Sequence, residues 1–286
     1  VKDLTIEMAT GSSLYSVIGY ATSTINGLNL NNCYFILSGA SIRGICSLTA
    51  TFITVENCYF SFTGVAGAYS TAVESGSISD SIISNCDFIS TTTVNKTFVL
   101  VETTANNLII KNCIIRNGNL IVAVDPAICD GLIITNNTIL NTTSVTTSGY
   151  SLFDFFTITD SIVSGNIIEI SNFNKAIFNC AESLENVYFI NNIINVTTAI
   201  TVATEALIQS AASSRFFIIG NIIETLGSNK ECILITGNSV NVCVADNSIT
   251  LGGVVSSGDI IKFTSTLVYY TNISTNHFRS TTTSAA

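Results

Sequence analysis

Four acidic residues precede copies of a repeated turn pattern at nearly equal distances. Glu74, Glu102, Asp125 and Asp154 lie 12, 11, 12 and 12 residues before the fourth position of the pattern that follows each of them. If each pattern marks one coil of a stack, these acids form a column with about 4.8 Å between neighbours. Asn179 and Gln209 continue the column without charge.

This expected acidic column has three interpretations. Carboxyl groups about 5 to 9.5 Å apart serve as acid, base or nucleophile in glycosidases, so neighbouring or alternate coils supply a suitable pair. Ca²⁺ binds several carboxylate oxygens, so a calcium site is the second interpretation. The third is a row of solvated acids at outward strand ends, with no ligand. No other cofactor is expected, because one His and no Cys-x-x-Cys pair give no zinc site.

Tyrosines are the candidate sugar-stacking residues, because the chain has no Trp. Those in or near expected loops are Tyr69, Tyr150, Tyr269 and Tyr270. They are candidate glycan-binding residues, and the alternative is that they are ordinary surface tyrosines.

The turn pattern itself occurs ten times, from Leu30–Phe35 to Ile273–Phe278, and reads apolar, any, turn residue, Cys or Asn, any, apolar. Successive copies are 24 to 29 residues apart. The residue before the fourth position is Asn, Gly, Asp or Thr in every copy, which predicts a tight bend, since Asn, Gly and Asp tolerate positive φ. The fourth positions, called the ladder below, are Cys33, Cys58, Cys86, Cys113, Asn137, Asn166, Asn192, Asn221, Asn247 and Asn276.

Ladder side chains are expected to point inward and to have a structural role. A buried Asn can hydrogen-bond to the same Asn in the next coil, so every amide finds a partner. Cys in the first four copies is a small apolar substitute. The nine cysteines are therefore expected mainly as free thiols in the core, with disulfides between neighbouring coils as the alternative.

Apolar strand-forming runs before each ladder position give about three strands and one variable loop per repeat of about 27 residues. This predicts an all-β, right-handed, single-stranded parallel β-helix of about ten coils of 24–29 residues. The signature residues of WD40 and leucine-rich repeats are missing, and a β-sandwich would show hairpin turns. We expect residues 1–24 as a lead-in or cap strand, 25–280 as the β-helix and 281–286 as a tail.

The ladder and its spacing resemble the pectate-lyase-like superfamily of right-handed β-helices over residues 25–280. In that superfamily an Asn ladder marks the second turn of each coil, and the resemblance places the active cleft of its enzymes on the sheet before the ladder. The superfamily includes polysaccharide lyases, glycoside hydrolases, phage tailspikes and bacterial surface proteins, and fold alone does not choose among them. The polygalacturonase segments NTD, DD, GHG and RIK do not occur, which argues against catalysis.

The residue after each ladder position is expected to face outward, and four of the ten are isoleucines: Ile114, Ile167, Ile193 and Ile222. Exposed aliphatic stripes usually mark an interface. The resemblance to tailspikes implies a parallel homotrimer about this face. A covering loop or terminal segment is the alternative.

Charge and composition limit the partners. The net charge is −9 with only ten Lys and Arg, so nucleic acid is not expected. No apolar run approaches the roughly 20 residues of a membrane span, so no membrane insertion is expected. The expected function is a viral, phage-like spike or fibre at the virion surface or outside the cell, attached to a cell-surface polysaccharide or glycoprotein. A polysaccharide-degrading hydrolase or lyase and a bacterial surface adhesin are the alternatives.

Overall fold

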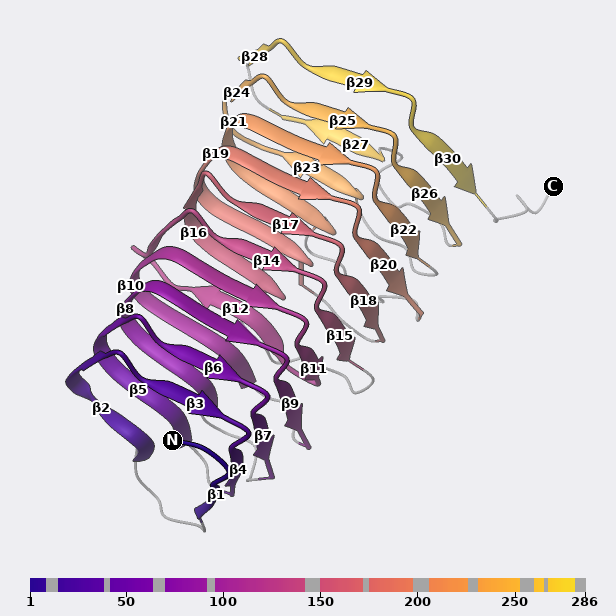
Figure 1. Cartoon of the computed structure of the whole chain (residues 1–286). Coiled ribbons are helices and arrows are strands. Elements are labelled where there is room, and N and C mark those ends of the chain that lie inside the picture. Colours follow the sequence, from indigo (N-terminus) through magenta and orange to yellow (C-terminus); the bar gives the residue numbers. More distant parts are fainter. Residues whose placement is uncertain are drawn as a thin grey trace.

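The chain folds as a stack of parallel strands (Figure 1). The computed structural model describes residues 1–8, 15–38, 42–63, 70–91, 96–141, 150–171, 175–197, 206–225, 231–252, 260–264 and 267–280. All the elements in these ranges are strands, and each paired strand lies parallel to its neighbour one coil away. The predicted all-β parallel β-helix is therefore confirmed. Within the same ranges, no helix long and apolar enough to span a bilayer is found.

One sheet follows the ladder and contains eleven strands in chain order. Every strand except β1 begins with the residue that comes directly after a ladder position, so these residues are paired from coil to coil. The strands are β1 (Thr5–Met8), β4 (Tyr34–Leu37), β7 (Tyr59–Phe62), β9 (Asp87–Ser90), β11 (Ile114–Arg116), β15 (Thr138–Asn141), β18 (Ile167–Ile170), β20 (Ile193–Val196), β22 (Ile222–Thr225), β26 (Ser248–Leu251) and β30 (His277–Ser280).

The strands before the ladder cover the other two faces of the stack. Seven are long and turn from one face to the next: β2 (Tyr15–Asn26), β5 (Ile42–Thr51), β8 (Ser70–Ser84), β10 (Lys96–Lys111), β16 (Phe153–Thr159), β19 (Phe178–Ile190) and β21 (Ile208–Ile219). The other strands before the ladder are shorter: β3 (Asn29–Asn31), β6 (Thr54–Glu56), β12 (Asn119–Ala123), β13 (Ile128–Asp130), β14 (Ile133–Thr135), β17 (Ile162–Ser164), β23 (Ile233–Ile235), β24 (Ser239–Val240), β25 (Cys243–Ala245), β27 (Ile261–Phe263), β28 (Val268–Tyr269) and β29 (Asn272–Ser274).

The tight bend before each ladder residue is confirmed in all ten copies, because every residue at this position has a positive φ. Seven of these are Asn or Asp and two are Gly, while Thr275 is the β-branched exception at φ 54°. The ten positions are Asn32, Asn57, Asn85, Asn112, Asn136, Gly165, Asn191, Gly220, Asp246 and Thr275.

A second corner lies five residues before each bend and also has positive φ. Its residues are of many types: Gly27, Phe52, Asp80, Asn107, Gly131, Asp160, Asn186, Arg215, Asn241 and Tyr270. Two side-chain hydrogen bonds connect this corner between coils, from Asn107 Nδ2 to Asp80 Oδ1 at 2.9 Å and from Asn186 Nδ2 to Asp160 Oδ1 at 2.6 Å. Sequence patterns missed this corner because Phe, Arg and Tyr are not turn signals.

The ladder side chains are inside, and the Asn residues bond from coil to coil. Asn137 Nδ2 donates to Asn166 Oδ1 at 3.0 Å, and Asn166 Nδ2 donates to Asn192 Oδ1 at 2.9 Å. Each Nδ2 also reaches a backbone carbonyl, such as that of Ile110 for Asn137. The Cys thiols donate to backbone carbonyls instead, as Cys113 Sγ does to Lys111 O at 3.3 Å. All nine cysteines are free.

Residues at the two ends differ in how much the structure describes. Within 1–24, β1 pairs with β4 and β2 pairs with β5, so this segment continues the parallel stack. Residues 281–286, expected as a tail, lie outside the described residues.

Along the axis, aromatic stacking adds to the core, as Phe35 and Phe60 show with ring centroids 4.6 Å apart.

Candidate functional site

The predicted column of four acids does not form. Glu74 pairs with Leu100, Leu100 with Val122, and Val122 with Asp154, so Glu74 and Asp154 share a column but lie three coils apart. Glu102 and Asp125 are outside this column. The stacking of all four acids, on which the expected glycosidase pair and calcium site were based, is therefore wrong. Among the described residues, no three His, Cys, Asp or Glu side chains gather where they could hold a metal ion.

The error arose because the number of residues between the first strand of a coil and its ladder position is not constant. In β10 the register shifts between Val101 and Thr104, and this shift contains Glu102. Asp125 lies between β12 and β13, where residues 124–127 form a longer turn. Counting a fixed number of residues back from the ladder therefore assigns Glu102 and Asp125 to a column that neither of them joins.

Glu74 is part of the folded core and not of an open site. Its side chain is buried, with Arg43 Nε 2.5 Å and Thr71 Oγ1 3.1 Å from the same carboxylate oxygen, Oε2. Burial raises the pKa of Glu74, and the Arg43 guanidinium opposes that rise. The carboxylate of Glu74 thus forms an ion pair between neighbouring coils.

The predicted continuation of the column beyond Asp154 is confirmed. Asn179 Nδ2 donates to Asp154 Oδ1 at 2.7 Å, and Gln209 Nε2 donates to Asn179 Oδ1 at 2.9 Å. The other oxygen of Asp154, Oδ2, accepts the backbone N–H of Ser151 at 2.8 Å. Asp154 is therefore held by hydrogen bonds at both oxygens, at the head of a row of amides.

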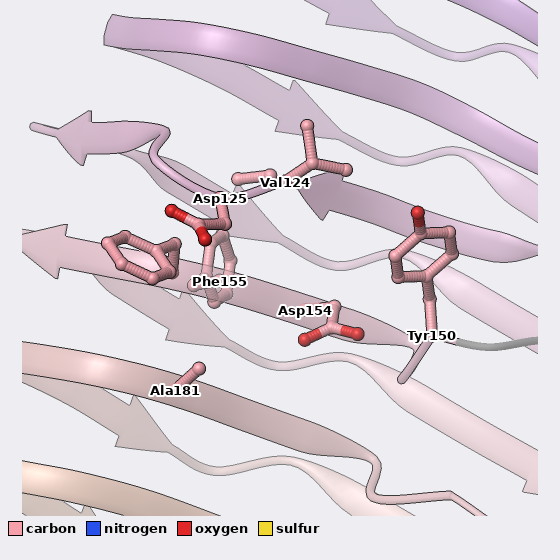
Figure 2. A pocket seen from close by; sticks show the side chains of 8 residues that line it. Val124, Asp125, Tyr150, Asp154, Phe155 and Ala181 are labelled. Carbon is pink, nitrogen blue, oxygen red and sulfur yellow. The ribbon is translucent and has the colours of Figure 1, made fainter.

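Asp154 lines a hollow on the outside of the stack together with Asp125 and Tyr150 (Figure 2). In the figure Asp154 lies between Asp125 on one side and the ring of Tyr150 on the other. The hollow has a volume of about 360 Å³ and is bounded by Phe156 and Ala181. Asp125 and Asp154, which the sequence predicted to stack in one column, thus line the same hollow instead.

A second hollow of about 320 Å³ shares Ala181 with the first and continues along the axis. It is lined by Asn179, Gln209, Ala211 and Thr236. We call the two hollows together the acidic groove: Asp125, Tyr150, Asp154, Phe156, Asn179, Ala181, Gln209, Ala211 and Thr236.

Register shifts create the acidic groove. One wall is the column of Asp154, Asn179 and Gln209. The other wall comes from residues that bulge out of the pairing, since the register shifts between Phe155 and Thr157 in one coil and between Cys180 and Ser183 in the next. Small side chains at the bulges, such as Ala181, leave open space between the two walls.

The other predicted tyrosines are not in this groove. Tyr69 lies outside the described residues. Tyr269 and Tyr270 are exposed at the far end of the stack, and Tyr270, which is 81% exposed, lines a separate hollow with Arg215 and Phe217. Phe156, Ala181 and Arg215 were missed by sequence reasoning, because only bulges and corners bring them to these positions.

The isoleucine stripe is present on the surface. Ile167, Ile193 and Ile222 are paired in register on β18, β20 and β22 and are 41%, 43% and 44% exposed. Ile114 lies in the same column but is separated from Ile167 by Thr138. The structure thus confirms the outward position of these residues.

A second outward row, four residues before the ladder, was not predicted. It contains Ile133, Ile162, Tyr188 and Phe217, which are paired in successive coils. Ile190 and Ile219 lie between this row and the bend and are half-buried. We call the surface around the bend, without Phe217 at its C-terminal end, the apolar ridge: Ile133, Ile162, Ile167, Tyr188, Ile190, Ile193, Ile219 and Ile222.

Comparison with known proteins leaves the groove and the ridge as the basis for any assignment of function. The chain matches no protein-family model and no curated protein sequence.

Proposed function

We propose that this β-helix binds a cell-surface glycan in the acidic groove, as the attachment part of a viral or phage-like spike or fibre at the virion surface or outside the cell. The observation that carries the proposal is the groove itself, where Tyr150, two carboxylates and a row of amides line two adjoining hollows that share Ala181. The finer placement in the right-handed, pectate-lyase-like superfamily belongs to the same proposal and is supported by the Asn ladder.

The chemistry of the groove suits a sugar chain. Carboxylates and amides accept and donate the hydrogen bonds of sugar hydroxyls, and an aromatic ring packs against the apolar face of a pyranose. From the coil of Asp125 to the coil of Thr236 the groove crosses five coils, or four steps of about 4.8 Å, and so extends for about 19 Å. That length accommodates a short oligosaccharide.

The charge of the groove limits the glycan to a neutral or amino-sugar type. Asp125 and Asp154 line it, and none of its described lining residues is Lys or Arg. A polyanion such as pectate would approach two carboxylates in the groove and a chain of net charge −9. We therefore expect acidic polysaccharides to bind this site less well than neutral or amino sugars.

A panel of neutral, amino and acidic oligosaccharides tests the proposal with the whole chain. We expect binding of neutral or amino members, and loss of at least tenfold in affinity for Tyr150→Ala and Asp154→Asn. Tyr34→Ala is the matched control, since Tyr34 is an exposed tyrosine on β4. If both groove variants bind as well as the unmodified chain, the groove is not the glycan site.

A second candidate function is glycoside hydrolysis, favoured by the meeting of Asp125 and Asp154 in one hollow. A carboxylate pair across a bound sugar supplies the acid and the base or nucleophile. Incubation with bound oligosaccharides distinguishes the two functions. Product formation that stops in Asp125→Asn and Asp154→Asn supports hydrolysis, and intact oligosaccharide after prolonged incubation supports attachment alone.

Self-association, as a parallel homotrimer, is the third part of the proposal, with the apolar ridge as its contact. Copies of net charge −9 repel one another, and this repulsion is weakest where the contact surfaces carry no charge of their own. The ridge has no acidic or basic side chain over four coils, and its rows repeat at the strand spacing, so a second copy offers a surface with the same period. A second copy is therefore the occupant for which this surface is suited.

A further inference from the structure

A third hollow lies near the C-terminal end of the described stack, on the face that precedes the bend. Its volume is about 420 Å³, and Phe217, Val242 and Cys243 supply its apolar lining. Val242 is fully buried and forms the floor. This hollow is separate from the acidic groove and shares no lining residue with it.

The hollow exists because a stack of rings ends there. Tyr188 and Phe217 are paired in neighbouring coils, and their rings are stacked with centroids 4.7 Å apart and planes 9° apart. The next residue in this column is Cys243, and the one after it is Asn272. A thiol is much smaller than a ring, so the stack stops at Phe217 and leaves space above it.

The opposite wall of the hollow is polar. Arg215, Asn241 and Tyr270 belong to the second corner of three successive coils, each two residues before the column that contains Phe217. Arg215 Nη2 donates to Glu185 Oε1 at 2.6 Å. A guanidinium has five N–H donors, so the same fork can serve a second carboxylate. Asn272 adds an amide at the rim of the hollow.

We infer that this hollow binds a single sugar ring that carries a carboxylate, such as a hexuronate unit. The sugar ring occupies the space beside Cys243 and packs on the open face of the Phe217 ring. The sugar thereby continues the stack formed by Tyr188 and Phe217. The carboxylate binds Arg215, and the hydroxyls bind Asn241, Asn272 and the Tyr270 phenol. The charge preference is opposite to that of the acidic groove, and the inference does not depend on the groove.

Saturation-transfer NMR on the whole chain tests the inference with glucuronate and glucose, which differ only at C6. We expect transfer to glucuronate, with affinity for glucose at least tenfold lower. Cys243→Phe fills the hollow with the chain's own ring and abolishes the signal. Arg215→Gln removes the preference for glucuronate over glucose. Ile133→Phe is the matched control, because it adds the same ring to an exposed position in the same column.

Three results overturn the inference. Equal binding of glucose and glucuronate shows that Arg215 does not select a carboxylate. Unchanged glucuronate binding in Cys243→Phe shows that the ligand is elsewhere. Binding of benzoate without glucuronate shows that the hollow takes an aromatic ring and not a sugar. Tyr150→Ala leaves glucuronate binding intact if the two sites are independent, so failure here and failure of the groove are distinguished.

Discussion

The side-chain Nδ2 of Asn192 donates a hydrogen bond to Oδ1 of Asn221 over 3.0 Å, and the backbone N–H of Asn192 reaches the same oxygen at 2.9 Å. Asn192 Nδ2 also donates to Val163 O at 3.1 Å, and its own Oδ1 accepts from Asn166. One side chain thus connects three coils. Its removal takes the acceptor from the backbone N–H of Asn166 and the donor from the Val163 carbonyl, and leaves Asn221 Oδ1 with one donor from residue 192 instead of two.

Asn192→Ala is therefore expected to lower the free energy of unfolding by about 3 kcal/mol, which urea denaturation measures. Cys113→Asn is the contrasting variant. Asn137 Oδ1 already accepts the backbone N–H of Cys113 at 2.9 Å, so an amide at 113 extends the ladder by one coil at little or no cost in stability. Equal stability of Asn192→Ala and the unmodified chain would contradict this account of the ladder.

Thr275→Asn is expected to stabilise the last bend by about 1 kcal/mol. The left-handed conformation costs an ordinary L-residue roughly 1–2 kcal/mol and costs Asn less, and Thr275 adopts it at φ 54°. The amide of His277, which donates to Asn247 O at 2.8 Å, reports on local opening. Its hydrogen exchange should slow about fivefold. Thr275→Ala retains the conformational cost, so an equal slowing in that variant would sink the explanation.

Glu74 is expected to matter for stability and not for ligand binding. Glu74→Gln breaks a buried ion pair and leaves Arg43 without its anion, which should cost about 3 kcal/mol in thermal or urea unfolding. Replacement of both Arg43 and Glu74 by Met should recover much of that loss. If the Glu74→Gln variant has the stability of the unmodified chain but no longer binds or cleaves glycan, Glu74 has a functional role and this prediction is wrong.

Alkaline pH is expected to lower the free energy of unfolding, because several thiols are buried. Burial raises the pKa of Cys46 to about 11 and those of Cys129, Cys180 and Cys232 to about 12, from an ordinary 9.0. The unfolded chain loses these protons at lower pH than the folded chain does. The contribution of the buried thiols to the free energy of unfolding is therefore fully present below pH 9 and falls as pH rises from 9 toward 12. Each thiol costs about 1.4 kcal/mol at pH 10.

Lys96 acts with the opposite sign, because burial lowers its pKa to about 8, and it favours the folded state increasingly between pH 8 and 10.5. One lysine does not offset four thiols. Urea denaturation under reducing conditions at pH 8, 9, 10 and 11 measures the net loss. Cys129→Ala should be less stable at pH 8 and lose less on going to pH 11. A flat profile above pH 9 would show that the thiols titrate in the same way in both states.

Ile193→Lys is expected to dissociate the proposed trimer without unfolding it, because the charge falls in the middle of the apolar ridge. Leu48→Lys makes the same change at an exposed aliphatic residue on β5, away from the ridge, and should leave the oligomer intact. Analytical ultracentrifugation of the unmodified chain and the two variants decides the matter. A monomeric unmodified chain would end the proposal of self-association.

The sequence by itself determined the ladder, the bend and the outward stripe. A left-handed bend favours Asn, Gly or Asp, and a buried amide that repeats in the next coil finds a partner there, so both leave a mark in residue types such as Asn191 and Asn192. Ile193 follows directly, and no insertion comes between it and the ladder. Its outward position could therefore be predicted correctly from counting alone.

Only the tertiary structure decided which residues meet before the second corner. Bulges and turns of different lengths separate the first strand of each coil from the ladder, and nothing in the residue types records their length. Glu102 and Asp125 were consequently assigned to the wrong column, and the Arg43 partner of Glu74 could not be foreseen. The turn at residues 124–127 places Asp125, and the bulges place Phe156 and Ala181, beside the paired column that begins at Asp154, because residues that leave the pairing are free to line a hollow beside it.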